Sequence, residues 1–292
     1  MLSAAVYVSL EKLIPMRSPA VACFVVFAAL LSVAAPASGQ VRPIYVNGQA
    51  GDKGFIIQNG AVIGTFGSAD NAAYALAVAG DIRTYATNPK GAGNIYTLTG
   101  TLVGPTAPAT VCCFYDGTTD GINNFTVQDV AGVVWRANRD WSGMTALFGT
   151  GGQKFGITFD SGDNSLWLGQ FSGSPGVFSL FEYALNGTLM SSFTPSLPAN
   201  SLGITALAYD PVDQTLWFSN YTSTPSLYQY SRSGTQLNVV TVTGTNSWFT
   251  GAEFNETVTA TPEPTSVLLL GTGLIGTIAM VRRRRGAIRC SS

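Results

Sequence analysis

Short runs of alternating apolar and polar residues, separated by turn residues, fill the middle of the chain. Between residues 41 and 260 the sequence is rich in Val, Ile, Phe, Tyr and Trp as well as Gly, Ser, Thr and Asn, and no stretch keeps an apolar repeat of helical period. Branched and aromatic residues favour strands, and Gly and Asn favour the turns between them. The pattern predicts an all-β domain long enough to bury one large core.

Two segments of this domain repeat the same pattern. Residues 156–168 read GITFDSGDNSLWL, and residues 207–218 read LAYDPVDQTLWF. Each consists of an apolar strand, a tight turn bounded by Asp, and a second strand that begins with Leu-Trp. The Asp residues at equivalent places are Asp160 and Asp163 in the first copy and Asp210 and Asp213 in the second. Because Asp side chains cap tight turns by hydrogen bonding to nearby backbone, we interpret them as turn caps, with metal ligation as the alternative.

A second type of hairpin, with a glycine at its turn, recurs five times. The turn glycines are Gly60, Gly100, Gly143, Gly187 and Gly234, between 40 and 47 residues apart. A repeat of this length with about four strands is typical of a β-propeller blade, which buries its faces against its neighbours. We therefore predict a β-propeller of five four-stranded blades over residues 40–260. Six blades, if the ends build another, and an irregular β-sandwich are the alternatives.

The first repeat is incomplete, and the end of the domain offers the strand that it lacks. Two apolar pieces, 248–249 and 252–254, follow the fifth hairpin. If they pair with the first strands, both ends of the domain lie in one blade and the ring has no open edge.

The first 39 residues have the three parts of a secretory signal peptide. Arg17 precedes an apolar run over 20–33, and small residues follow up to a cleavage site after Ala37 or Gly39. Residues 1–15 lengthen the amino side unusually, so Met16 is the predicted start of translation.

The other end carries Pro262, Glu263 and Pro264, an apolar stretch over 265–281, and then four arginines, Arg282, Arg283, Arg284 and Arg285. Seventeen residues of helix span about 25 Å at ~1.5 Å per residue, enough for a thin bilayer. The arginines hold their end in the cytoplasm, because carrying them across the membrane costs several kcal/mol each. The pattern predicts one transmembrane helix with the domain outside.

This order of motif, short apolar helix and arginine cluster resembles the PEP-CTERM sorting signal of Gram-negative envelope and biofilm proteins. The resemblance covers residues 261–292, with Pro262, Glu263 and Pro264 as the sorting motif and Arg282 to Arg285 as the cluster that fixes membrane topology. It implies export through the general secretory machinery and processing by exosortase, a membrane-embedded cysteine transpeptidase. It implies nothing about the activity of the domain.

Charge sharpens this division of the chain. The net charge is -1, but seven of the fifteen Lys and Arg lie in the terminal segments; between residues 40 and 261 eight face fourteen Asp and Glu, a net charge of -6. Such a domain lacks the clustered cations that nucleic acid binding needs, so no nucleic acid partner is expected. The sequence has no His, which excludes His-dependent triads and His-ligated metals.

Three further groups have candidate chemistry. Cys112 and Cys113 are adjacent, and we expect a buried or half-buried pair on a strand rather than a redox or metal site. The polar run 116–121 lacks the oxygen spacing of a calcium loop. Four tryptophans at repeat positions are candidates for stacking on sugars, but we interpret them as blade-packing core: Trp135, Trp141, Trp167 and Trp217.

Three classes of function remain. The favoured hypothesis is a noncatalytic, surface-exported propeller that binds or organises extracellular polysaccharide or another envelope protein. The alternatives are a carbohydrate-active enzyme that works with carboxylates alone, and a purely structural matrix protein. No catalytic residue, metal or cofactor is predicted.

Overall fold

A computed structural model of the protein describes residues 42–49, 53–67, 73–86, 92–222 and 224–255, and all the regular structure there is β-strand. The all-β prediction is confirmed for these residues. The predicted signal peptide, its start at Met16 and the C-terminal segment 261–292 lie outside them.

The described strands form five antiparallel four-stranded sheets, here called blades I to V. Blade I contains β20 (Phe249–Phe254), β1 (Ile44–Gly48), β2 (Gly54–Gln58) and β3 (Ala61–Phe66); blade II contains β4 (Ala73–Val78), β5 (Ile82–Ala86), β6 (Ala92–Tyr96) and β7 (Leu102–Pro108); blade III contains β8 (Phe114–Thr119), β9 (Asn123–Gln128), β10 (Val133–Asn138) and β11 (Thr145–Gly149); blade IV contains β12 (Lys154–Asp160), β13 (Ser165–Gln170), β14 (Leu180–Ala184) and β15 (Leu189–Phe193); blade V contains β16 (Thr205–Asp210), β17 (Thr215–Ser219), β18 (Ser226–Ser231) and β19 (Gln236–Thr241).

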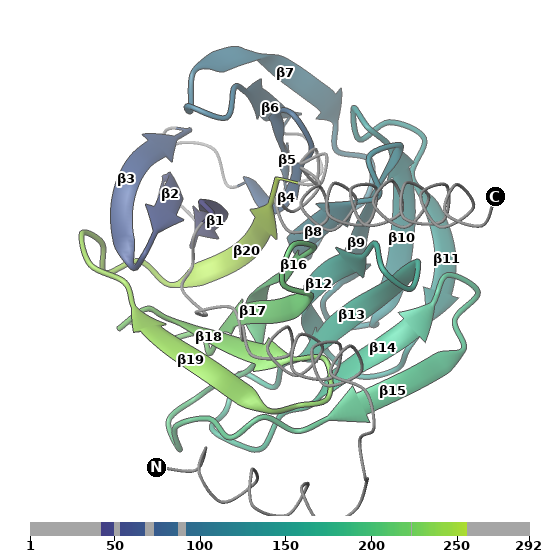
Figure 1. Ribbon diagram of the computed structural model, residues 1–292. Helices are drawn as coiled ribbons and strands as arrows, with labels where there is room; N and C mark the ends of the chain where they lie inside the picture. Colours follow the sequence, from purple (N-terminus) through teal and green to yellow (C-terminus); the bar gives the residue numbers. More distant parts are fainter. Residues whose placement is uncertain (1–41, 50–52, 68–72, 87–91, 223, 256–292) are drawn as a thin grey trace, which may run out of the picture. The chain divides into compact units, whose positions relative to one another are not determined.

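The five blades surround a common axis (Figure 1), and the first strand of each sheet, β20, β4, β8, β12 or β16, is the innermost. Apolar side chains fill the spaces between neighbouring blades, for example Phe125 of blade III against Phe159 of blade IV. The five-bladed prediction is confirmed, and the six-bladed and β-sandwich alternatives are wrong.

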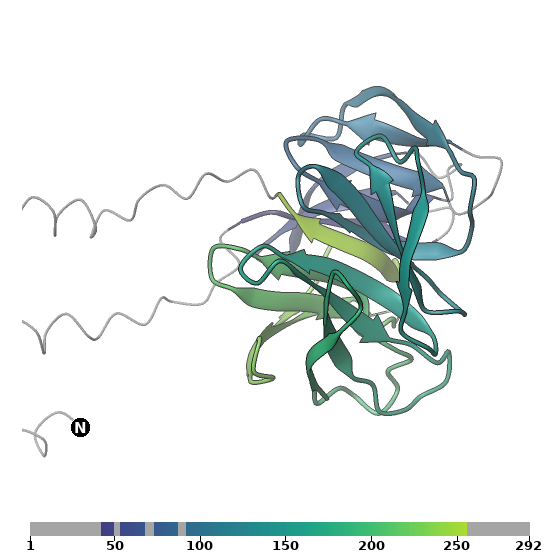
Figure 2. The same cartoon turned by 90° about the vertical axis from the view of Figure 1, so that its right-hand side faces the viewer.

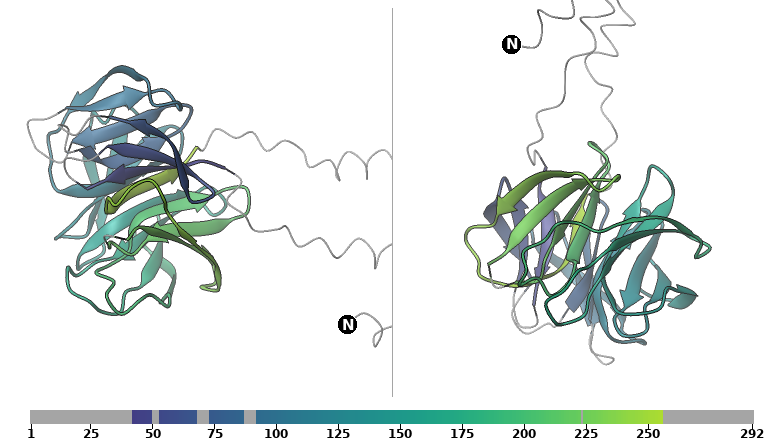
Figure 3. Two further views of the ribbon diagram at one scale, coloured as in Figure 1. Left: turned by 90° about the vertical axis from the view of Figure 1, so that its left-hand side faces the viewer. Right: turned by 90° about the horizontal axis from the view of Figure 1, so that it is seen from below.

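Blade I is built from both ends of the domain, as predicted. Strand β20 pairs antiparallel with β1, with Ile44 opposite Phe254 and Val46 opposite Ala252. The yellow-green β20 lies beside the purple β1 (Figure 3), and between blades II and V when seen from the side (Figure 2). Pairing the two ends closes the ring and removes the open edge that a missing strand would leave.

Two of the turn glycines lie where the preceding blade leaves no room for a side chain. Gly187 and Gly234 have φ angles of 85° and 86°, a region that L side chains rarely adopt. A Cβ atom would lie 2.8 Å from Phe148 at the first position and 2.9 Å from Phe193 at the second. Each turn therefore packs on the outer strand of the preceding blade, and the period of the glycines is the period of the blades.

A buried carboxylate lies where the innermost strands meet. Asp116 on β8 is fully buried. Its Oδ2 accepts hydrogen bonds from the backbone N–H groups of Ile157 on β12 (3.1 Å) and Leu207 on β16 (2.9 Å). Its Oδ1 accepts from Ala252 on β20 (3.1 Å) and from the adjacent Gly117 (2.8 Å). One side chain of blade III is thus bonded to the backbones of blades IV, V and I.

Two hydroxyl groups serve the same purpose further along the axis. Thr118 Oγ1 accepts from the N–H of Phe159 (2.9 Å), and Thr158 Oγ1 accepts from the N–H of Tyr209 (2.8 Å). Innermost strands have no partner on the axis side, and buried N–H groups without an acceptor are costly. These side chains supply the acceptors, so the axis is filled with hydrogen bonds between blades.

The environment of Asp116 has opposing effects on its ionisation. Burial raises the pKa of its carboxyl well above the ordinary value, and the four N–H donors oppose that rise. Both oxygens face N–H donors, so the geometry suits a carboxylate that accepts every bond.

The two ends of the blades differ in their connections. At one end, here called the turn face, hairpin turns of two to six residues join the third strand of each blade to the fourth and, in blades II to V, the first strand to the second. At the other end, the loop face, the described connections reach eleven residues; the longest are 171–179, 194–204 and 242–248. The described chain begins and ends at the turn face, where Arg42 donates a hydrogen bond to the carbonyl oxygen of Asn255.

We expect Asp116→Asn to lower the free energy of unfolding by about 3 kcal/mol or more, because an amide NH2 would replace an acceptor and each unsatisfied buried N–H costs ~1–3 kcal/mol. Asp140→Asn is the control, since Asp140 is exposed and accepts from Ser142 in a turn; its loss should stay within about 1 kcal/mol. Urea unfolding measures both. Equal losses would contradict the role of Asp116 between blades.

Candidate functional site

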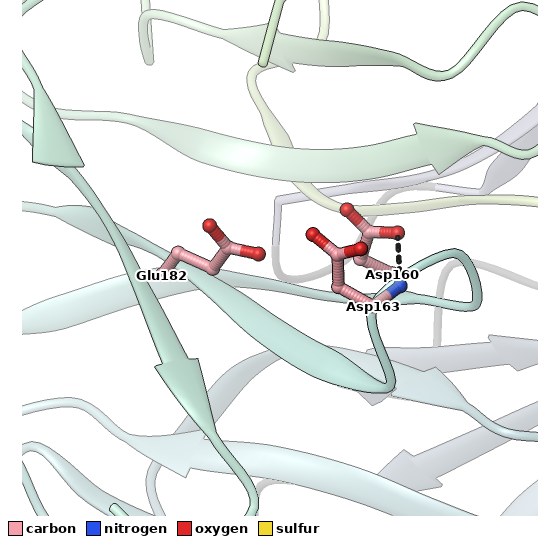
Figure 4. Close-up of side chains that lie close together, drawn as sticks. All are labelled: Asp160, Asp163 and Glu182. Atoms are coloured by element: carbon pink, nitrogen blue, oxygen red, sulfur yellow. Dashed lines mark hydrogen bonds between the residues drawn. The ribbon is translucent and has the colours of Figure 1, made fainter. Parts of the chain in front are cut away.

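Three carboxylates cluster at the turn face of blade IV (Figure 4). Asp160 ends β12, Asp163 lies in the turn that follows and Glu182 lies on β14, with one oxygen of each within 4.8 Å of the others. Asp160 and Glu182 are buried and Asp163 is exposed. Oxygen clusters suit hard cations such as Ca²⁺, so the donors around these oxygens decide what the cluster holds.

Many of those donors come from the protein. Asp160 Oδ1 accepts from the backbone N–H groups of Gly162 (2.9 Å) and Asp163 (3.4 Å), which confirms the turn-cap interpretation for this residue. Asp160 Oδ2 accepts from the indole N–H of Trp167 (3.3 Å). The two oxygens of Glu182 accept from the hydroxyls of Ser165 (2.8 Å) and Ser191 (2.9 Å).

Arg232 supplies a cation to the cluster. Its guanidinium, which comes from the hairpin turn of blade V, forms ion pairs with Asp160 (2.8 Å), Glu182 (3.3 Å) and Asp163. A metal ion would have to displace this guanidinium from all three carboxylates. The cluster is therefore an ion-pair network that ties blade V to blade IV. While Arg232 is in place, the three carboxylates do not fit a metal ion.

The second copy of the motif, in blade V, follows the same plan with one change. Asp210 Oδ1 accepts from the N–H of Val212 (3.0 Å) and forms an ion pair with Arg42 of blade I (2.9 Å). Asp213 accepts from the side-chain amide of Gln229 (3.0 Å). Gln229 lies opposite Trp217 as Glu182 lies opposite Trp167, so this copy lacks the third carboxylate.

The arginine contacts recur between other blades. Arg139 of blade III pairs with Asp81 of blade II (3.0 Å). Between blades III and IV the equivalent hairpin position is Leu185, which packs on the apolar cluster that contains Phe125 and Phe159. Ion pairs thus join blades II to III, IV to V and V to I. The sequence repeat did not reveal these ion pairs, because the partners are far apart in the chain. The separation is 58 positions between Arg139 and Asp81, 50 to 72 between Arg232 and its three carboxylates, and 168 between Arg42 and Asp210.

The structure places the candidate tryptophans in the body of the propeller. Trp141, Trp167 and Trp217 are at most 1% exposed, and Trp135 is half-buried against the apolar cluster between blades II and III. The core interpretation is confirmed, and stacking of sugars on the three buried rings is excluded.

A different set of aromatic residues lies at the loop face. Five rings from blades III, IV and V and from the loop that enters blade I form a continuous row, here called the aromatic row: Tyr115, Phe155, Phe171, Tyr221 and Trp248. Phe155 and Tyr221 are buried, and the other three are half-buried. Sequence reasoning missed this row, because its members occupy different positions in their blades and meet only in the folded ring.

Inner-strand irregularities help to place the row. Tyr115 and Phe155 are extra residues in β-bulges: β8 shifts register between Phe114 and Gly117, and β12 between Lys154 and Gly156. A bulge bends its strand and re-aims a side chain. Both rings therefore lie at the loop end of the inner strands, next to the residues that bond at the axis.

The two described cysteines also lie at the loop face, in the connection 109–113 rather than on a strand, so the predicted placement on a strand is wrong. Both are free and half-buried. A hydrogen bond with Cys112, together with burial, raises the pKa of the Cys113 thiol to about 11. Cys113 is therefore a weak nucleophile at neutral pH. Nearby, the buried amine of Lys154 donates to the carbonyl of Gly151 (2.9 Å).

The predicted sorting residues, Pro262 to Pro264 and Arg282 to Arg285, lie outside the described residues, as does the predicted membrane helix over 265–281. Among the residues that are described, no helix has the length and apolar character to cross a membrane.

Residues 260–285 match the family model described as the PEP-CTERM protein-sorting motif. The chain thus carries, beside a five-bladed propeller, a sorting signal that implies an exported protein processed by exosortase. The predicted motif at Pro262, Glu263 and Pro264 lies inside the matched segment.

Solved structures resemble the propeller at low identity. A chain of the nidogen/laminin complex is 10% identical with a TM-score of 0.48, covering 73% of this chain and 97% of that one. A protein of unknown function from Bacteroides caccae is 12% identical with a TM-score of 0.46, covering 74% and 99%. Hydrazine synthase of Kuenenia stuttgartiensis is 8% identical with a TM-score of 0.43, covering 74% and 70%. Likeness at this level carries no information on binding or activity. A comparison with curated proteins gave no match.

We expect Arg232→Ala to lower the free energy of unfolding by about 2 kcal/mol, because two buried carboxylates, Asp160 and Glu182, lose their cation. The partial exposure of Arg232 keeps this loss below that of a fully buried ion pair. Calcium should restore part of this loss in the variant and leave the wild type unchanged. Arg136→Ala, at an exposed arginine on β10, is the control and should change stability by less than about 0.5 kcal/mol. Thermal unfolding with and without calcium measures these effects; strong stabilisation of the wild type by calcium would contradict the ion-pair assignment.

Replacing Glu263 or Pro264 with Ala should leave the protein unprocessed in the inner membrane, because the motif is what the processing enzyme recognises. Cell fractionation and the mass of the product measure this, with Thr261→Ser as the control. Processing of both variants at the wild-type rate would contradict the assignment of the motif.

Proposed function

We propose that the protein is an exported cell-envelope component whose propeller is a noncatalytic binding module associated with extracellular polysaccharide, held by a C-terminal membrane helix until exosortase processes it. The observation that supports this proposal most strongly is the division of the propeller into two different faces. Asn255, the last described residue, lies at the turn face, and the segment that matches the sorting-signal family begins at residue 260. An anchor attached there leaves the loop face, with its long connections and aromatic row, free to meet a partner.

The state of the carboxylates supports a noncatalytic role. A glycosidase that uses carboxylates needs two of them beside one sugar, one as an acid and one as a base or nucleophile. Asp116 is engaged by four backbone N–H groups, and Asp160 and Glu182 are engaged by Arg232. These acidic groups therefore already have structural partners.

The design of the loop face supports a binding role over a purely structural one. Binding residues are concentrated on loops that a rigid scaffold holds in place. The turn face has short turns with Asp caps and ion pairs, whereas the loop face has long connections and half-buried aromatic rings. A matrix component without a ligand would have no need for this difference.

We expect the exported protein to bind polysaccharide extracted from the matrix of the producing cells saturably and without shortening the chains. Co-sedimentation gives the binding curve, and size-exclusion chromatography gives the chain length after incubation. Shortened chains would indicate the carboxylate enzyme, and association that never saturates would indicate the structural matrix protein; either result would contradict the proposal.

A further inference from the structure

We infer that the aromatic row is the binding site and that its ligand is a neutral carbohydrate chain. This inference rests on the proposed function, because it assigns the site and the ligand class for the polysaccharide binding proposed there.

The rings form one connected series of stacked and edge-to-face contacts across several blades, in which Tyr115, Phe171 and Trp248 are the half-buried members. Phe155 is stacked between Tyr115 (centroids 4.0 Å apart, planes 8° apart) and Phe171 (3.6 Å, 7°). Tyr221 meets Phe171 edge to face (5.5 Å, 84°), and Trp248 meets Tyr221 in the same way (4.7 Å, 83°). Aromatic residues with an apolar body and a polar tip, such as Tyr and Trp, suit ligands that combine apolar faces with hydroxyl groups, as pyranose rings do.

The backbone holds the rings in position. The N–H of Phe171 donates to the carbonyl oxygen of Gln153 (3.3 Å), and Phe171 forms an isolated antiparallel bridge with Gly203. A Cβ atom on Gly203 would lie 2.4 Å from the Phe171 ring, so this position requires glycine. The N–H of Gln49 donates to the carbonyl oxygen of Trp248 (2.8 Å). The row is thus preorganised, which lowers the entropy lost on binding.

Tyr221 adds backbone strain at the same place. Its φ angle is 52°, in the left-handed region that bulky residues rarely adopt. Strained residues of this kind persist where the surroundings enforce them, and they cluster at ligand sites. The carbonyl oxygen of the preceding residue, Asn220, accepts from the N–H of Leu202 (3.3 Å), which ties this segment to the neighbouring long loop.

The loops around the row carry few charges. The described charged residues beside it are Lys53, in the connection that contains Gln49, and Asp129 and Lys154, and the amine of Lys154 is bonded to the carbonyl oxygen of Gly151. The segments 150–153, 171–179, 194–204, 220–225 and 242–248 contain no Asp, Glu, Lys or Arg, and they are rich in Ser, Thr, Gly and Asn. A site for an acidic polymer or an anionic membrane would need cations for charge complementarity. Hydroxyl and amide groups beside aromatic rings instead match a ligand that has many hydroxyls and no charge.

Tyr115 of the row directly precedes the buried Asp116, and shielding that carboxylate from water is the structural role against which the inference is tested. Trp248→Leu and Phe171→Leu keep the apolar cover but remove the aromatic faces. Trp135→Leu is the matched control, since Trp135 is half-buried like Trp248 but lies on β10 in the body of the propeller.

The experiment measures binding of cello-, malto-, xylo- and chitohexaose, and of an oligogalacturonate as the acidic probe, to the full chain in detergent by tryptophan fluorescence and calorimetry. We expect saturable binding of at least one neutral hexasaccharide and none of the acidic probe. Affinity should fall about tenfold or more in Trp248→Leu and Phe171→Leu and stay unchanged in Trp135→Leu. Thermal unfolding of each variant shows that the propeller is folded.

Several results would overturn the inference. Unchanged affinity in both variants of the row, preference for the acidic probe, or the absence of binding to every neutral hexasaccharide would each do so. The matrix polysaccharide then separates this failure from that of the proposed function. If the wild type and Trp248→Leu bind it equally well, the site assignment fails and the proposed function stands; if the wild type does not bind it, the proposed function fails.

Discussion

The structure depends on how five inner strand edges are satisfied at one axis. Each blade brings an edge strand to the centre, where backbone N–H groups have no strand to pair with and no access to bulk water. Asp116 resolves part of this conflict, since its two oxygens accept from Ile157, Leu207 and Ala252 in three other blades. The free-energy cost of removing one carboxylate from water is offset by the hydrogen bonds that it accepts from the inner strand edges. Because those bonds cross blades, the ring is one unit rather than five stacked hairpins.

Because of this constraint, some parts of the chain can vary less in sequence and length than others. The axis, the turn glycines and the ion pairs of Arg42, Arg139 and Arg232 all fix one blade to another, and the arginine contacts lie at the turn face. The described loop face joins blades through aromatic stacking and a few backbone bonds instead of ion pairs, and its connections are long and varied in length. A binding surface there can be shaped without disturbing closure, while the described chain ends at the opposite face, at Asn255.

Much of the fold could be predicted from the sequence, and the reason is the repeat. The period of the turn glycines gave the blade count, and the leftover apolar pieces after the fifth hairpin gave the closure of blade I by β20. The turn role of Asp160 followed from its place before a Gly-Asp turn. Asp116 was visible only as part of a polar run, because nothing local reveals that four N–H groups will converge on it. The partners of Arg232 and the members of the aromatic row were equally hidden, since they come from separate blades and from bulges that shift the strand register.

Native-state hydrogen exchange at the amides of Ile157, Leu207 and Ala252 tests most directly whether one carboxylate ties the blades together. All three N–H groups donate to Asp116 from different blades. If the ring opens only as a whole, they exchange with one common free energy, equal to that of global unfolding. Exchange of the three amides with separate free energies, each below the global value, would contradict a cooperative ring held at Asp116.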